Sequence, residues 1–266
     1  MLRKLMKYEL KSTARILIPL YITLLVFATI SKIFIETRVT DKLHDFGAIP
    51  FFLSVFGYGC TMAAVFIVTF FVIIQRFYKN LLGDEGYLMN TLPVSTITNI
   101  TSKISIATFW NIISIFVAIL SIIIMAFNPN TFSKFFNELF RALSDGYSEF
   151  GVHFYIVIIE IIIAILVYLI KFLTMIYASI SIGHLFNKHR ILSSFGAFIV
   201  LNLITTAISS SIGIASSIIG KTFYDNIQSL LTIHLFLIFA ILFNLVFFIV
   251  YFAITNYILK NKLNLE

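Results

Sequence analysis

The sequence predicts an all-α integral membrane protein with six transmembrane helices, and three observations lead to this fold class. The 266 residues are 60% hydrophobic and only 12% charged, with a mean hydropathy of +1.01. Soluble domains usually carry about 25% charged and 45–50% apolar residues, which disfavours an ordinary globular enzyme. Long apolar runs recur along the chain, and lysine and arginine are concentrated in alternate segments between them.

Six apolar runs are long enough to be membrane spans, because a helix needs about 20 mainly apolar residues to cross the hydrocarbon core. They cover residues 16–35, 49–74, 104–127, 154–173, 191–219 and 230–259. The first run has no small-residue cleavage site, so we expect it to be a span and not a signal peptide.

The distribution of basic residues predicts that both termini are cytoplasmic, since lysine and arginine stay inside when they lie in short loops. With the N-terminus inside, the outer loops hold Arg38, Lys42, Lys134, Arg141 and Lys221 together with seven acidic residues. The inner segments hold twelve basic residues: Arg3, Lys4, Lys7, Lys11, Arg15, Arg76, Lys79, Lys103, Lys188, Arg190, Lys260 and Lys262.

The net charge of +7 does not indicate a nucleic-acid partner, because the basic residues follow the inner membrane edge and form no groove lined with aromatic side chains. The single cysteine, Cys60, allows no intrachain disulfide or multi-cysteine metal site. We expect it to be a small packing residue of the second span.

Residues 1–15 predict an amphipathic helix that lies on the inner leaflet, followed by the six-helix domain of residues 16–266. Glu9 falls in the middle of its apolar face, so either the helix is irregular there or Glu9 meets a protein partner. The basic face holds Arg3, Lys4, Lys7, Lys11 and Arg15, and the apolar face holds Leu2, Leu5, Met6 and Leu10.

Residues 131–143 predict a second amphipathic helix, on the outer side, which Gly146 would end. Either it seals the top of the helix bundle or it acts as a substrate-sensing lid. Its apolar face holds Phe132, Phe135, Phe136, Leu139, Phe140 and Leu143, opposite Ser133, Lys134, Asn137 and Arg141.

The inner loop between spans two and three, residues 76–103, predicts a short helix of its own. Gly83 interrupts the helix that leaves the membrane, and Asp84 and Glu85 suit the first turn of a new one. Pro93 limits that helix, which would cover residues 84–91, and Ser95 offers an N-cap for the third span.

This loop resembles that of ABC-2 type permeases of Gram-positive bacteria, in which it forms a coupling helix that docks on a cytosolic ATPase. The resemblance implies that the chain pairs with a second copy or a sibling permease in the bacterial cell membrane and recruits two ATPase subunits, which bind ATP and Mg. The chain is also similar to permeases that export or confer immunity to amphipathic peptides, of the phenol-soluble-modulin or bacteriocin type. The residues implied to contact the ATPase are Leu82, Gly83, Asp84, Glu85, Gly86, Tyr87, Leu88, Thr91 and Pro93.

The chain itself lacks a nucleotide-binding loop, so we expect a transport subunit and not an enzyme. Gly220, Lys221 and Thr222 match the end of a phosphate-binding loop, but its first glycine would fall on Ala215. Any ATP hydrolysis would therefore occur on another chain, and no cofactor is expected on this one.

Ionisable residues inside spans normally face protein or water, which singles out Glu160 in span four. It would either line the translocation pathway or have a structural partner; Lys171, about 16 Å further along the same face, is expected to reach toward the membrane edge. Single polar residues in other spans are expected to form interhelical hydrogen bonds, and no metal-ligand spacing is present. They are Asn111, Asn202, His234 and Asn244, of which Asn202 and Asn244 are further candidates for the pathway.

The outer part of span five, residues 209–217, is rich in serine and glycine. Such small residues permit either a re-entrant hairpin, as the family resemblance implies, or a long tilted helix.

These features together predict the permease subunit of an ATP-driven exporter of hydrophobic or amphipathic substrates, and the resemblance implies that the substrates are peptides. The alternatives are an ion-coupled secondary transporter, an ATPase-independent membrane immunity protein, and an intramembrane enzyme. The only candidate cluster for an enzyme is His184, Lys188, His189 and Arg190 in an inner loop.

Overall fold

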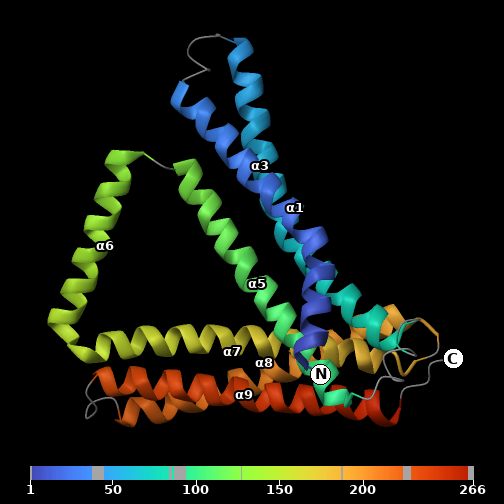
Figure 1. Cartoon of the computed structure of the whole chain (residues 1–266). Coiled ribbons are helices and arrows are strands. Elements are labelled where there is room, and N and C mark those ends of the chain that lie inside the picture. Colours follow the sequence, from blue (N-terminus) through green and yellow to red (C-terminus); the bar gives the residue numbers. More distant parts are fainter. Residues whose placement is uncertain are drawn as a thin grey trace. The chain divides into compact units, whose positions relative to one another are not determined.

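The computed structural model describes residues 2–37, 45–83, 86, 94–126, 128–186, 188–223 and 229–262, and this part of the chain contains helices but no strands (Figure 1). The helices are α1 (Leu2–Thr37), α3 (Asp45–Phe77), α5 (Thr96–Ala126), α6 (Pro129–Phe150), α7 (Val152–Gly183), α8 (Arg190–Phe223) and α9 (Ser229–Asn261). A π-helical turn, η1 (Tyr78–Leu82), follows α3 directly.

Six of these helices are long and apolar enough to cross a membrane, which confirms the six predicted spans. The qualifying stretches are Leu2–Thr37, Ile49–Leu82, Thr96–Ala126, Val152–Gly183, Arg190–Gly213 and Leu231–Asn261. Most extend beyond the apolar runs because a helix continues past the hydrocarbon core until a cap or a turn ends it.

The chain divides into two compact units. The first comprises Met1–Arg76 and Thr101–Arg141, and the second comprises Phe77–Ile100 and Ala142–Glu266. Residues 77–100 of the inner loop and the last three spans therefore belong to the second unit.

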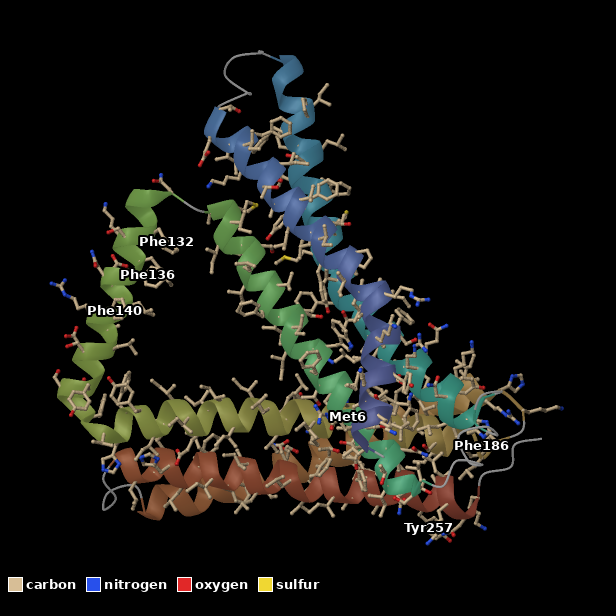
Figure 2. All side chains as sticks on the ribbon, in the orientation of Figure 1. Met6, Phe132, Phe136, Phe140, Phe186 and Tyr257 are labelled. Carbon is tan, nitrogen blue, oxygen red and sulfur yellow. The ribbon has the colours of Figure 1, made fainter. Side chains whose placement is uncertain are left out.

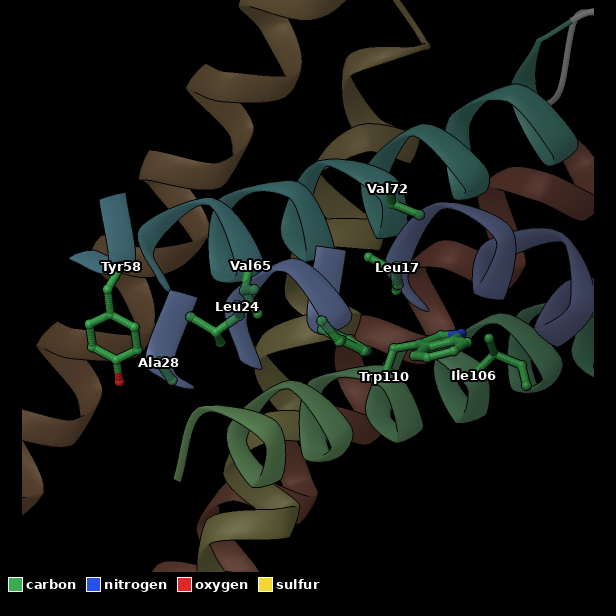
Figure 3. Close-up of a cluster of buried hydrophobic side chains, with 9 residues drawn as sticks. Leu17, Leu24, Ala28, Tyr58, Val65, Val72, Ile106 and Trp110 are labelled. Atoms are coloured by element: carbon green, nitrogen blue, oxygen red, sulfur yellow. The ribbon is translucent and has the colours of Figure 1, made fainter. Parts of the chain in front are cut away.

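Helices α1, α3 and α5 form the core of the first unit (Figure 3). Leu17 and Leu24 of α1 are completely buried against Val65 of α3. Trp110 of α5, the only tryptophan of the chain, completes this cluster, and its ring lies 6.1 Å from that of Tyr21.

The N-terminal segment does not form a separate helix, which corrects our prediction for residues 1–15. Helix α1 runs without interruption from Leu2 to Thr37, and Met6 and Leu10 pack against the core of the first unit. The expected basic face is exposed. Met6 and Leu10 of the predicted apolar face thus pack against protein, whereas Leu2 is exposed.

Helix α6 is amphipathic as predicted, but it is longer than residues 131–143. Phe132, Phe136 and Phe140 project from one side of it (Figure 2), and neighbouring rings of this row lie 4.6 and 6.3 Å apart. Gly146 does not end the helix, because the break comes at Gly151, whose φ of 59° suits a residue without a side chain.

In the second unit, α7 packs against both α8 and α9 (Figure 1). Gly183 permits close contact between α7 and α8, because a Cβ atom there would lie 2.0 Å from Ser194 Oγ. The backbone of α8 continues as one helix through Phe223. The structure therefore has the long helix and not the re-entrant hairpin.

Candidate functional site

The base of the inner loop is an ordered turn at the end of α3. The π-helical turn η1 leads into Gly83, whose backbone is extended and whose N–H donates to the carbonyl of Tyr78 at 2.8 Å. Single π-helical turns are often found at functional sites because they re-aim the chain. The predicted interruption of the helix at Gly83 is confirmed.

Two aromatic contacts hold this base to α7 within the second unit. Phe77 is fully buried and stacks on Tyr177, with ring centroids 4.0 Å apart and planes inclined by 7°. The ring of Tyr78 lies 6.2 Å from that of His184, which caps the end of α7. A displacement of the turn would therefore displace the inner end of α7.

His184 joins three segments of the second unit. It is 7% exposed, it shares a hydrogen bond with the backbone of Leu82, and its Nε2 lies 3.3 Å from a guanidinium nitrogen of Arg190. Burial and the positive charge of Arg190 lower the pKa of His184, against the opposing effect of the Leu82 hydrogen bond. The contacts of His184 make it a structural link between the loop, α7 and α8.

The structure describes three of the nine predicted coupling residues, Leu82, Gly83 and Gly86. Leu82 is 3% exposed and Gly86 is also buried, so neither offers an accessible docking surface in this chain. Gly83 is half-buried at the end of the turn. The remaining residues lie outside the described part of the chain: Asp84, Glu85, Tyr87, Leu88, Thr91 and Pro93.

The far end of the loop is fixed by a cap and, in the first unit, by an ion pair. The hydroxyl of Ser95 accepts from the N–H of Thr98 at 3.3 Å, which confirms Ser95 as the cap of α5. Two turns further on, Lys103 Nζ lies 2.6 Å from Glu9 Oε2, with the side chains 3% and 11% exposed. Glu9 therefore has a protein partner, one of the two alternatives that its place in the apolar face left open.

The polar residues of the spans include one pair that joins two helices. His234 Nδ1 of α9 lies 2.8 Å from Glu160 Oε2 of α7, and the ring of His153 lies 5.5 Å from that of His234. Glu160 thus has a partner within its own unit. His153 was not among the predicted site residues, although its spacing of seven residues from Glu160 places both on one face of α7.

The hydrogen bonds of Asn111, Asn202 and Asn244 lie within their own helices, which corrects our expectation of bonds between helices. Asn111 and Asn244 donate to carbonyls four residues earlier, at 2.8 and 2.7 Å. Asn202, which is exposed, accepts from Thr206 at 3.2 Å.

Two further expectations require correction. Lys171 is buried, with its Nζ 4.6 Å from the ring centroid of Tyr168, so it makes a cation–π contact and does not reach toward the membrane edge. Cys60 is exposed on α3 and is not a packing residue.

Among the described residues, no group of three or more histidine, cysteine or acidic side chains is arranged to hold a metal ion. A scan of family models, a search of curated proteins and a search of solved structures each return no match to this chain. Its function must therefore be argued from its own residues.

Proposed function

We propose that this chain is the membrane-spanning subunit of an ATP-driven exporter of the ABC-2 type, which moves hydrophobic or amphipathic peptides out of a bacterial cell. The observation that carries the proposal is the anchored base of the inner loop. Phe77 and Leu82 are buried, and the stack of Phe77 on Tyr177 and the contacts of His184 connect them to α7 and α8. Loops that carry function are typically positioned by a rigid scaffold, and these contacts give the loop such a base.

The contacts at the base of the loop would allow motion of a cytosolic partner to be transmitted to the spans. When ATP brings two ATPase subunits together, each docked loop moves with its subunit. The Phe77–Tyr177 stack would pass this motion to α7, and the Lys103–Glu9 ion pair, in the first unit, would pass motion of α5 to α1. Rigid contacts of this kind are required to transmit a displacement, since a flexible connection would absorb it.

The remaining parts of the proposal follow from the surface of the spans. Large apolar side chains are exposed along all six, as expected for helices that meet lipid, a second permease chain or an apolar substrate. Few charges are available in the spans to bind a polar substrate. A pathway between two such chains would accept an amphipathic peptide.

The test is co-purification of the tagged chain with a co-expressed cytosolic ATPase, followed by measurement of ATP hydrolysis in lipid nanodiscs. Tyr87→Asp and Leu88→Asp should abolish recruitment, because each places a charge in the docking helix. Leu82→Asp is unsuitable, since Leu82 is buried and its replacement would disturb folding. Phe140→Asp is the matched control, because it places the same charge at an exposed aromatic position of α6.

Recruitment that survives both loop variants would refute the docking helix. A chain that purifies without any ATPase would instead favour an ion-coupled carrier or an ATPase-independent immunity protein.

A further inference from the structure

Three ionisable side chains form a row where α7 packs against α9. His153 and Glu160 share one face of α7, since seven residues make two turns to within about 20°. His234 of α9 connects them, with its Nδ1 2.8 Å from Glu160 Oε2 and its ring centroid 5.5 Å from that of His153. All three belong to the second unit.

The two ends of this row differ in burial. His153 lies in the first turn of α7 and is exposed, whereas the side chains of His234 and Glu160 are only 14% and 16% exposed. The row therefore leads from the end of the helix toward a carboxyl group inside a membrane-spanning segment.

The charge of the buried pair favours the uptake of one proton. An isolated carboxylate in an apolar span is costly, and so is an isolated imidazolium. The Glu160 carboxylate beside a neutral His234 has one net negative charge, and one added proton makes the pair neutral, whichever of the two residues carries it. A second added proton would leave a net positive charge at this site.

The two nitrogens of His234 have different surroundings. Nδ1 faces the Glu160 carboxylate, which can only accept, so Nδ1 carries the proton. Nε2 is buried and has no hydrogen-bond partner among the described residues. Nε2 therefore holds an unused lone pair that can receive a proton from a neighbouring group.

We propose that His153, His234 and Glu160 form a proton relay that delivers a proton from the end of α7 to the Glu160 carboxylate. Water protonates His153, and this proton passes to Nε2 of His234, directly or through one water molecule. The Nδ1 proton of His234 moves to Glu160 Oε2 at the same time. His153 returns to its neutral form, His234 ends as its other neutral tautomer, and Glu160 becomes a neutral acid.

The relay removes one negative charge from the α7–α9 interface for each proton taken up. The hydrogen bond between Glu160 and His234 then loses its charge assistance, which roughly halves its strength. The other charged side chain on this face of α7 is Lys171, about 16 Å from Glu160 along the helix axis and therefore beyond direct contact. The titratable groups of the preceding turns are the exposed Asp145, Tyr147, Glu149 and Tyr155. The side chain of Lys221 and the residue Asp225 lie outside the described part of the chain.

Infrared spectroscopy of the full-length protein in lipid nanodiscs, recorded after a rapid drop in pH, tests the relay. A band from a newly protonated carboxyl group should form in the wild-type protein and be absent in Glu160→Gln. His234→Asn keeps a donor for Glu160 but has no second ring nitrogen, and His153→Gln removes the entry point. In both variants the band should form about 100-fold more slowly, the lower limit for the effect of a positioned acid or base.

His189→Asn, which removes an exposed histidine outside the row and keeps a residue type that tolerates the positive φ of 64° there, is the control and should behave as the wild-type protein does. Circular dichroism and size-exclusion chromatography select the variants that remain folded. A band that persists in Glu160→Gln, or wild-type kinetics in either His153→Gln or His234→Asn, would overturn the relay. The measurement needs no ATPase, so its outcome is independent of the proposed function.

Discussion

The buried ion pair between Glu9 and Lys103 gives the sharpest test of how the first unit is held together. The charged atoms are 2.6 Å apart, and the side chains of Lys103 and Glu9 are 3% and 11% exposed. At an effective dielectric constant of about 20, unit charges at this separation attract each other by about 6 kcal/mol. Desolvation of both groups offsets most of this attraction, so the pair as a whole contributes little net stability.

Removal of one partner has a much larger effect than removal of both. Glu9→Gln leaves Lys103 buried without that counter-charge, and we expect the free energy of unfolding to fall by about 3–5 kcal/mol. Lys103→Met should lower the free energy of unfolding by a similar amount, because it leaves Glu9 buried without the counter-charge of Lys103. The double variant should lie within about 1 kcal/mol of the wild-type protein, because it buries no charge at this position.

The chain carries its own reporter for this experiment. Trp110, its only tryptophan, lies two turns from Lys103 on α5, and its Nε1 donates to the hydroxyl of Thr13, one turn from Glu9. Tryptophan fluorescence during unfolding in mixed detergent micelles therefore follows the α1–α5 contact itself. The double-mutant cycle gives the coupling energy between the two charges.

A matched control lies at the other end of α1. Lys32 and Glu36 form an exposed pair at 3.5 Å, and Glu36→Gln should change stability by less than about 1 kcal/mol. If the double variant instead lost the sum of the two single losses in free energy of unfolding, the two charges would act independently. That result would refute this account of Glu9.

Two further predictions concern the second unit. Gly183→Ala should lower the melting temperature, because the new Cβ would lie 2.0 Å from the hydroxyl and 2.4 Å from the backbone nitrogen of Ser194. In the control, Gly196→Ala, the new Cβ meets nothing within 4 Å, so this variant should be neutral or stabilising by up to about 1 kcal/mol. Equal melting temperatures for the two variants would contradict this packing. His184 has a lowered pKa in the folded chain, so its contribution to stability is complete above the ordinary histidine pKa of about 6.5 and is lost as the pH falls through the lower folded value. His184→Gln should flatten the acid side of a plot of melting temperature against pH, and an unchanged slope would indicate that other groups cause the loss.

The sequence was sufficient to predict the elements that depend on local chemistry. Hydropathy located all six spans, because apolar length alone decides whether a helix can cross a bilayer. The interruption at Gly83 and the cap at Ser95 were also predictable, since each depends on the conformational or hydrogen-bonding properties of a single residue.

The sequence was insufficient where a residue's role depends on a distant neighbour. Gly146 was expected to end α6, yet it lies within the helix beside Phe154, whose ring would be 2.6 Å from an added Cβ atom. Met6 and Leu10 of the predicted apolar face pack against a protein core, but the periodicity of this face is the same as that of a helix lying on lipid. Glu9 was recognisable as an exception in that face, but its partner is 94 positions further along the chain.

The candidate site was predictable only in part for the same reason. Glu160 could be identified as a costly charge within a span, and the interhelical hydrogen bond expected of His234 is confirmed, but the sequence did not pair these two residues, which are 74 positions apart. The stack of Phe77 on Tyr177 left no pattern in the sequence, since aromatic residues are frequent throughout this chain.

One face of α5 explains how the first unit obtains a specific packing in an environment where apolar contact alone gives little specificity. Lys103, Trp110, Ser114 and Ser121 lie within about 20° of one line along this helix. Each makes a hydrogen bond to another helix: Lys103 to Glu9, Trp110 to Thr13, Ser114 to Tyr21 and Thr69, and Ser121 to Tyr58.

Lipid chains are as apolar as leucine, so burial of apolar side chains does not distinguish one register of these helices from another. A shift of α5 by one residue would rotate this line by 100° and break all of its hydrogen bonds together. The polar line therefore fixes the register of α1 and α3 against α5, and the apolar side chains around Leu17, Leu24 and Val65 fill the space that this register leaves.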